Sequence, residues 1–321
     1  MSVQAPRAVL LIRPHRFTAN PHTAEDNSFQ SLDDRAPDVV AQAAYDEVTA
    51  VEAALIGAGV TVHLFEDTSA ESPDSVFPNN WISTHAGGHV ALYPMFVPNR
   101  RTERRPDIVE MLKSRYRVQD VIDYSGLEHD DVFLEGTGAM VLDHELRIAY
   151  TARSHRADPV ILERFCTNFG FEPIVFDALD PSGMPVYHTN VMMCIATDFV
   201  LAGLDLITSG ARRAEVARRL TSEGRVIVDL DVDQISSFAG NAIELQGDRG
   251  RVLAISSRAW RSLRAEQRAI IELSASPLVL DVPTIERAGG SVRCMLAGIH
   301  LETRPADQAH SEPTSELAAA Q

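Results

Sequence analysis

Three side chains far apart in the chain have the chemistry of a nucleophilic site: the thiol of Cys294, the imidazole of His188 and the carboxylate of Glu135. Cys294 follows Gly289 and Gly290, which permit a sharp turn that could present the sulfur to a pocket. A lone cysteine more often packs in a core as a small hydrophobic residue. The thiol becomes a candidate nucleophile only if the fold brings a base and a carboxylate to it.

The residues around Cys294 have the pattern of a strand. We expect Val292 and residues 295–299 to be extended. Alternate side chains of a strand point to opposite faces, so Arg293 would point away from the side that Cys294 faces.

A pattern of two strands, a helix and a strand recurs along the chain. Its copies start near Pro78, Glu135, His188 and Gly240, which are 57, 53 and 52 residues apart. A fixed period of this length is typical of radial or solenoid repetition. A linear solenoid needs capping units, which the sequence does not show. Helices are expected near residues 39–56, 106–115, 159–169, 211–222 and 259–273.

The two ends of the chain complete the pattern. The apolar strand expected at residues 8–12 lacks a unit of its own, and the final run through Cys294 would complete it. We therefore predict an α/β fold, a five-bladed α/β propeller of repeated ββαβ units with both termini in one blade. One position of every repeat then points to the axis, so polar residues at that position converge on a central pocket.

The same position of successive repeats carries polar residues next to apolar or glycine residues. Each has a structural alternative: Glu135 as an exposed strand-entry carboxylate, His188 as a satisfied core histidine, and Asn80 and Asn190 as turn residues. For any one residue alone the structural alternative is the better explanation. Their shared position in the repeat favours the pocket.

Composition limits the class of protein. The 321 residues include 45 acidic and 29 basic side chains, and a net charge of −16 does not favour binding to nucleic acid. No apolar run approaches the ~20 residues of a membrane span. Three cysteines without a close pair form neither a disulfide framework nor a zinc pattern. We expect a soluble cytoplasmic protein without metal or cofactor, and the sequence leaves its oligomeric state open.

The end of the chain differs from the rest. Residues 303–321 are rich in proline, alanine, serine and glutamate and have no periodicity, so we expect a disordered tail. Residues 1–302 are then expected to form a single catalytic domain.

Five segments together resemble the guanidine-modifying (pentein) superfamily, which includes arginine deiminase, glycine amidinotransferase and dimethylarginine dimethylaminohydrolase. The resemblance covers residues 7–301 and is nearest to the bacterial citrulline-utilisation hydrolases, an amidinotransferase-like group. It implies a five-bladed α/β propeller, in agreement with the repeat. The segments are residues 76–81 (VFPNNW), 134–138 (LEGTG), 186–193 (VYHTNVMM), 238–241 (FAGN) and 290–295 (GSVRCM).

The resemblance implies roles for the three reactive groups. Cys294 falls on the family's nucleophile and His188 on its general acid/base. Glu135 falls on a carboxylate that binds the guanidine nitrogens of the substrate. A thiolate suits attack on the planar carbon of a guanidino or ureido group, and His188 would protonate the departing amine and then activate water.

Two asparagines depart from the deiminase pattern. Asn80 falls where deiminases usually carry an aspartate, and Asn190 where several members carry an aspartate two residues after the histidine. A ureido group is neutral and has a carbonyl oxygen that needs a donor, which an amide supplies and a carboxylate does not. We therefore expect Asn80 to let the site hold a ureido group. By the same resemblance, Asn190 is expected to bind the substrate as well, and Arg156 would bind its α-carboxylate.

The predicted function is a cysteine-dependent hydrolase of the ureido or guanidino group of citrulline or arginine, giving ornithine through a covalent S-linked intermediate. The expected partner is thus a small guanidino or ureido amino acid. One alternative is an arginine deiminase that stops at citrulline, or an amidinotransferase. Another is a non-catalytic pentein scaffold, which has no reason to keep thiol, imidazole and carboxylate at one position of the repeat.

Overall fold

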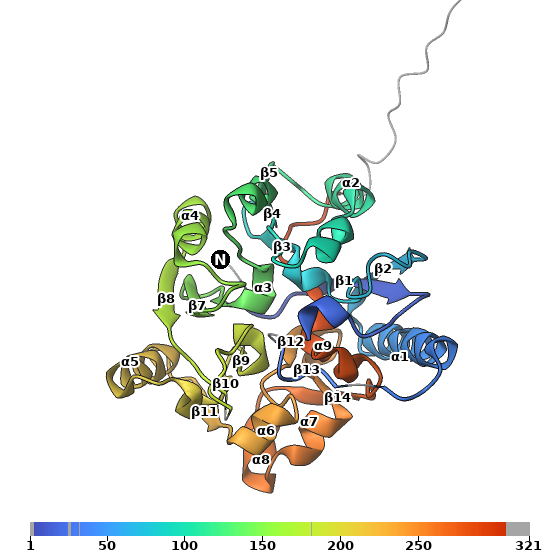
Figure 1. Cartoon of the computed structure of the whole chain (residues 1–321). Coiled ribbons are helices and arrows are strands. Elements are labelled where there is room, and N and C mark those ends of the chain that lie inside the picture. Colours follow the sequence, from blue (N-terminus) through green and yellow to red (C-terminus); the bar gives the residue numbers. More distant parts are fainter. Residues whose placement is uncertain (1–2, 25–26, 32, 181, 306–321) are drawn as a thin grey trace, which may run out of the picture.

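Five short β-sheets surround a central axis (Figure 1). The computed structural model describes residues 3–24, 27–31, 33–180 and 182–305. The strands of this part of the chain are β1 (Ala8–Pro14), β2 (Thr61–Asp67), β3 (Ile82–His85), β4 (His89–Leu92), β5 (Asp120–Asp123), β6 (Met140–Asp143), β7 (Ile148–Ala152), β8 (Glu172–Phe176), β9 (Met193–Ile195), β10 (Phe199–Ala202), β11 (Val226–Asp229), β12 (Ile243–Gly247), β13 (Gly250–Ser256), β14 (Ser276–Leu280) and β15 (Ala297–Ile299).

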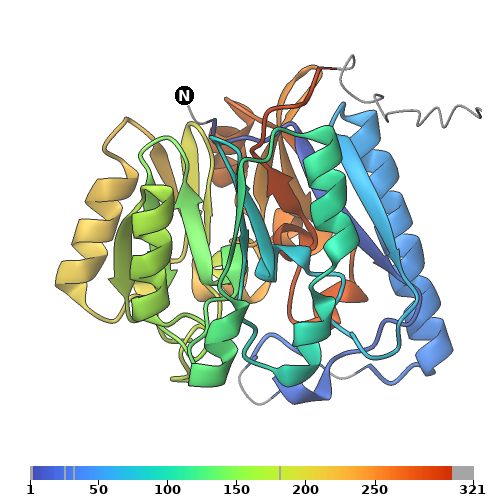
Figure 2. The same cartoon turned by 90° about the horizontal axis from the view of Figure 1, so that it is seen from above.

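The longer helices cover the outside of the sheets, and short ones lie near the axis (Figure 1). They are α1 (Pro37–Gly57), α2 (Pro106–Arg115), α3 (Gly136–Ala139), α4 (Pro159–Phe169), α5 (Gly210–Leu220), α6 (Val232–Ser236), α7 (Ser257–Ser262), α8 (Ala265–Glu272) and α9 (Val292–Met295). A proline at the first position starts α1, α2 and α4, where its fixed φ suits the first turn. In Figure 2, α1 (blue) and α5 (gold) lie on the outer sides of the strands.

Each sheet is built in the same way. An inner strand pairs antiparallel with a middle strand, and the middle strand pairs parallel with an outer strand. A helix makes the crossover from the middle to the outer strand, as parallel pairing requires. With the inner strand first, the sheets are β15-β1-β2, β3-β4-β5, β6-β7-β8, β9-β10-β11 and β12-β13-β14.

The two ends of the chain meet in one sheet. Strand β15 pairs antiparallel with β1, so that Ala8 lies opposite Ile299 and Leu10 lies opposite Ala297. The inner strands also contact one another around the axis, β15 against β3, β6 against β9, and β9 against β12. The five-bladed α/β propeller of ββαβ units expected from the repeat is confirmed.

The inner strands are short and almost entirely buried, with one half-buried residue each in β12 and β15. All four residues of β3 and of β6 are buried, and so are all three of β9. Their side chains do not alternate between core and solvent because one face meets the axis and the other meets a neighbouring blade. The turn that enters each inner strand is therefore held rigidly near the axis.

Two expected elements differ in the structure. Residues 292–295 form the helical turn α9 where a strand was expected, because the Asn241 side chain accepts the backbone N–H groups of Ser291 and Arg293 and closes the turn. The helix expected over residues 259–273 is two helices, α7 and α8, because Leu263 is extended. The other expected helices are present at nearly the expected residues.

The expected tail begins later than residue 303. Thr303 forms a β-bridge with Tyr116, and the Arg304 N–H donates to the Arg115 carbonyl at 2.9 Å. Residues 306–321 of the expected tail lie outside the described residues. Among the described helices, none combines the length and the apolar character needed to cross a membrane.

Candidate active site

The polar residues predicted from the repeat lie where the chain enters the inner strands. Asn80 ends the 3₁₀ turn before β3, and Glu135 immediately precedes α3 and β6. His188 and Asn190 lie in and next to the 3₁₀ turn before β9, and Cys294 lies in α9 just before β15. Corresponding positions of successive blades thus bring together side chains that are far apart in sequence.

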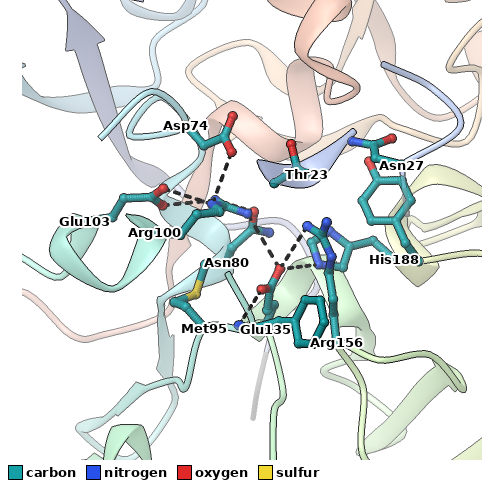
Figure 3. A network of polar contacts seen from close by, with 12 residues as sticks. Thr23, Asn27, Asp74, Asn80, Met95, Arg100, Glu103, Glu135, Arg156 and His188 are labelled. Carbon is teal, nitrogen blue, oxygen red and sulfur yellow. Dashed lines mark hydrogen bonds and ion pairs between the residues drawn. The ribbon is translucent and has the colours of Figure 1, made fainter. Parts of the chain in front are cut away.

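His188 and Glu135 form a buried hydrogen-bonded pair (Figure 3). The imidazole Nε2 lies 2.8 Å from Glu135 Oε2, and the two residues are 2% and 0% exposed. The other carboxylate oxygen of Glu135 accepts the backbone N–H of Phe96 at 3.0 Å. Both oxygens are therefore engaged, and the carboxylate fixes the orientation of the imidazole ring.

Two arginines complete the surroundings of Glu135. Arg156 Nη1 and Arg100 Nη1 lie 3.5 and 3.6 Å from Glu135 Oε2. Burial acts to raise the pKa of Glu135, but the charge of Arg156, the hydrogen bond from His188 and the charge of Arg100 outweigh it and hold that pKa well below its usual range. Glu135 is thus ionised at neutral pH.

The imidazole of His188 is neutral at pH 7. Burial lowers the pKa of His188, and the negative charge of Glu135 opposes that effect without overcoming it. A neutral imidazole can take a proton, as a general base must. In the free protein, His188 therefore brings no positive charge to the cavity that it shares with Cys294.

Two amide groups contact the sulfur of Cys294. The side chains of Asn190 and Asn241 each donate from Nδ2 to Sγ at 3.3 Å. Donors of this kind stabilise negative charge on sulfur more than they stabilise a neutral thiol. Cys294 and His188 line the same cavity, with a volume of about 20 Å³. Its other lining residues are Thr23, Asn27, Asp74, Phe77, Asn80, Arg100, Arg156, Tyr187, Ala288, Gly289 and Gly290.

Two glycines let these groups approach one another. A Cβ at Gly138 would lie 2.2 Å from Asn80 Nδ2 and 2.8 Å from His188 Nδ1. A Cβ at Gly290 would lie 2.8 Å from the ring of Phe77 and 3.1 Å from the Cβ of Cys294. Any side chain at either position would displace the residues of the site.

The structure adds a set of residues that sequence reasoning missed. Arg100 donates to Glu103 from Nε at 2.8 Å and from Nη2 at 2.9 Å, and its Nε lies 3.5 Å from Asp74 Oδ2. Arg100 also donates to Asn80. Asp74 and Arg100 lie in loops outside the repeated position, so nothing in the sequence distinguished them from surface charges. Asn241 was different, because it occupies the repeated position in the segment FAGN.

The six predicted site residues are brought together, although three lie differently from what their expected roles require. Asn190 contacts the Cys294 sulfur but is not among the residues that line the cavity. Glu135 lies behind His188 and is not among the residues that line the cavity. Arg156 lines the cavity, yet its guanidinium is 3.5 Å from Glu135. The remaining cysteines, Cys166 and Cys194, are packed in the core, as expected. The described residues contain no group of three or more His, Cys, Asp or Glu side chains placed to hold a metal ion.

A five-bladed ββαβ propeller with thiol, imidazole and carboxylate at its axis is the arrangement of the guanidine-modifying (pentein) superfamily. The family model described as N,N dimethylarginine dimethylhydrolase, eukaryotic, matches residues 13–301. The chain belongs to this family. No curated protein sequence matches it significantly.

Solved structures with the same fold support this assignment. ArgZ without ligand, an arginine dihydrolase from the ornithine-ammonia cycle in cyanobacteria, has a TM-score of 0.69 at 16% identity, over 94% of this chain and 41% of ArgZ. A cysteine-to-serine variant of the N-terminal domain of ArgZ, bound to substrate, has a TM-score of 0.69 at 14% identity, over 92% of this chain and 98% of that domain. This chain thus spans about two fifths of full-length ArgZ.

A third structure is of a protein whose name closely matches the description of the family model. It is a histidine-to-glycine variant of dimethylarginine dimethylaminohydrolase, as an adduct with S-methyl-L-thiocitrulline. Its TM-score is 0.64 at 15% identity, over 92% of this chain and 100% of that chain. At such low identity these similarities establish a shared fold.

Proposed function

We propose that the protein is a cysteine-dependent hydrolase of the ureido or guanidino group of an amino acid, citrulline or arginine, and that it releases ornithine. The observation that carries this proposal is the shared cavity of Cys294 and His188, with Glu135 hydrogen-bonded to His188 at 2.8 Å. Structural neighbours described as arginine dihydrolase and dimethylarginine dimethylaminohydrolase act on the same chemical group, which supports it.

The chemistry follows from the positions of these groups. His188 takes the proton of the Cys294 thiol, the resulting thiolate attacks the planar carbon, and a C–N bond breaks as His188 delivers that proton to the departing nitrogen. His188 then takes a proton from water, which attacks the S-linked carbon and releases the enzyme sulfur. Citrulline and one water give ornithine, carbon dioxide and ammonia. Arginine needs a second water and yields a second ammonia by way of citrulline.

Glu135 acts through His188 in this scheme. Its two oxygens are already engaged by Phe96, His188 and the two arginines, so we do not assign it to the nitrogens of the substrate. Its ionised carboxylate instead keeps the His188 Nε2 engaged and stabilises the imidazolium formed when His188 holds a proton. We assign the amide of Asn80 as the hydrogen-bond donor to the carbonyl oxygen of the ureido group. Its Nδ2 has no hydrogen-bond partner among the described residues.

The cavity also has groups suited to the amino-acid end of a substrate. Asp74 lines it and has one buried carboxylate oxygen, Oδ1, without a hydrogen-bond partner. Arg100 and Arg156 line it with positive charge. The α-ammonium group of an amino acid complements the negative charge of Asp74, and its α-carboxylate complements the positive charge of the arginines. A volume of about 20 Å³ holds little more than one water, so lining side chains must move when a substrate binds.

The test is product analysis with the full chain. L-citrulline, L-arginine and dimethylarginine are incubated separately with the protein and with Cys294→Ser, and ornithine, citrulline and ammonia are quantified. We expect ornithine from citrulline, with loss of all products in the variant. Accumulation of citrulline from arginine without ornithine would identify a deiminase, and product dependent on an added acceptor amine would identify an amidinotransferase. Inertness towards every compound would favour a binding scaffold.

A further inference from the structure

A second polar cavity lies along the axis and does not contain the nucleophile. Its volume is about 50 Å³, and residues of all five inner strands, β3, β6, β9, β12 and β15, line it. The catalytic cavity lies at the turns that enter these same strands. Cys294 lines the catalytic cavity and Arg293 lines the second one, so α9 separates the two.

Arg293 brings an uncompensated positive charge to this cavity. Its Nη1 donates to the Leu296 carbonyl at 2.9 Å, and no carboxylate of the described residues lies within ion-pair distance of its guanidinium. Burial lowers the pKa of Arg293, but a guanidinium stays charged in proteins. Arg293 is only partly exposed, and a charge that is partly removed from water without a partner is unfavourable, so a counter-charge is expected in the cavity.

The carboxylate that shares the cavity wall has other partners. Glu244 Oε2 accepts the backbone N–H of Thr197 at 2.8 Å and its hydroxyl at 2.6 Å. Glu244 Oε1 lies 3.5 Å from the guanidinium of Arg251 and has no hydrogen-bond partner among the described residues. Glu244 thus has an ion-pair partner within the described part of the chain, and Arg293 has none there.

His85 offers the same cavity a neutral donor. Tyr93 Oη lies 2.6 Å from Ser83 Oγ, which lies 2.7 Å from His85 Nε2. Every hydroxyl hydrogen in this row of hydrogen bonds has an acceptor when Tyr93 donates to Ser83 and Ser83 donates to His85 Nε2. With Nε2 as an acceptor, the ring hydrogen of the neutral His85 is on Nδ1. His85 is 0% exposed, and its Nδ1 has no hydrogen-bond partner among the described residues. A buried N–H without an acceptor points to a ligand that accepts.

We propose that the second cavity binds one small monovalent anion, of the class of halide, nitrate or formate, on the guanidinium of Arg293 and with His85 as a second donor. A volume of about 50 Å³ is room for such an ion together with water. The Arg293 backbone N–H is held by Asn241 and Cys294 is the next residue, so the ion orders α9 from the side opposite the catalytic cavity. This site does not depend on the proposed function.

Bromide tests the proposal directly. Crystals of the full chain grown or soaked in sodium bromide are measured at the bromine absorption edge. We expect an anomalous peak in the second cavity at hydrogen-bonding distance from the Arg293 guanidinium. A cavity that holds only water in bromide, with no anomalous peak, would overturn the proposal.

Chloride in solution provides an independent measurement. The protein broadens the ³⁵Cl resonance when chloride exchanges at a bound site. We expect Arg293→Gln to lose the excess line width, Arg293→Lys to keep most of it, and Arg117→Gln, at an exposed arginine, to leave it unchanged. Equal line widths for the wild type and a folded Arg293→Gln variant would contradict the site. Should that variant not fold, the bromide crystals of the wild type decide alone.

Discussion

Arg100 donates a hydrogen bond from Nη2 to Asn80 Oδ1 at 3.0 Å, and this bond fixes which way the Asn80 amide faces. A guanidinium only donates, so the amide oxygen must face Arg100 and the NH₂ group must face the other way. Within the part of the chain that the structure describes, Asn80 Nδ2 has no hydrogen-bond partner, and Asn80 lines the catalytic cavity. The donor that a ureido oxygen needs is thus already oriented in the free protein.

Changing Asn80→Asp tests that donor. We expect the kcat/KM for citrulline to fall by about 10²-fold or more, because removal of one positioned donor to a developing oxyanion typically costs that much. Ornithine and ammonia formation from citrulline are the measurements. Asn168→Asp is a matched control, since Asn168 is exposed on α4 and contacts the Tyr124 hydroxyl outside the cavity. Citrulline turnover at the full rate in Asn80→Asp would refute the role of the donor.

Glu135→Gln removes the charge that supports a proton on His188. Burial already lowers the pKa of His188, and the charge of Glu135 opposes this, so the variant should lower that pKa further. Less His188 is then protonated at any given pH, and a step that needs the imidazolium becomes slower by about 10²-fold or more. The pH dependence of kcat/KM should show its alkaline limb at lower pH.

A ¹H–¹⁵N titration of the His188 ring separates this effect from simple damage to the fold. Glu163→Gln, at an exposed position of α4, is the control variant. An unchanged titration of His188 in a folded Glu135→Gln protein would show that the carboxylate does not act through the imidazole.

The repeat in the sequence was sufficient to predict most of the fold and about half of the residues that form the site. Because one position of each ββαβ unit faces the axis, the spacing of Asn80, Glu135, His188 and Cys294 was enough to predict that they converge. The strand predicted around Cys294 was wrong, because Asn241, a residue far away in sequence, holds residues 292–295 as a helical turn. Such tertiary contacts override a local apolar pattern.

The residues that sequence reasoning missed have a common property. Asp74 lies between β2 and β3, and Arg100 and Glu103 lie in the 3₁₀ helix Pro98–Glu103 between β4 and α2, so none of them is at the repeated position. Their importance comes from burial and from contacts with one another, with Arg100 only 2% exposed. In a chain with 29 basic side chains, composition does not indicate which arginine is buried beside the site.

Alkylation should distinguish Cys294 from the other two cysteines. All three are almost fully buried, so exposure does not decide reactivity. Burial raises the pKa of Cys166 and of Cys194 to about 12, which leaves little thiolate at neutral pH. Cys194 lines the second cavity, whereas Cys294 lines the cavity that contains His188, and the Cys294 sulfur accepts two amide N–H donors.

We therefore expect one iodoacetamide adduct per folded chain, located on Cys294 by peptide mass spectrometry. Its formation should proceed at the same rate as the loss of activity. The Cys294→Ser protein should remain unlabelled under the same conditions, and labelling of Cys166 or Cys194 ahead of Cys294 would contradict the assignment.

Asn241 is expected to position the nucleophile. Its Oδ1 accepts the N–H groups of Ser291 and Arg293 at 3.2 and 3.1 Å, and its Nδ2 donates to the Asn190 carbonyl at 3.0 Å and to Cys294 Sγ at 3.3 Å. Asn241→Ala leaves buried donors without acceptors, so the free energy of unfolding should fall by about 2–4 kcal/mol. Urea unfolding measures this loss.

A purely structural role would leave the chemistry of the sulfur unchanged in the molecules that still fold. We expect instead that the rate of Cys294 alkylation falls at least tenfold under conditions where Asn241→Ala is folded. Gln246→Ala, at a half-buried residue of β12, is the control. An alkylation rate equal to that of the wild type would leave Asn241 as a residue of stability alone.

The histidines of the second cavity should make the protein sensitive to acid. Burial and the charge of Arg293 lower the pKa of His300 to about 4, against about 6.5 in an unfolded chain. Between these two values the unfolded chain binds the proton and the folded protein does not. The contribution of His300 to stability is therefore complete above pH 6.5 and is lost as the pH falls towards 4, by roughly 2–3 kcal/mol. His85 and His144 act in the same direction, because burial also lowers their pKa.

Urea unfolding at pH 7 and pH 5 should show a smaller difference in the free energy of unfolding for His300→Gln than for the wild type. His22→Gln, at an exposed position, should show the wild-type difference. If His300→Gln and the wild type lose the same free energy of unfolding between those two pH values, His300 does not contribute to the acid sensitivity.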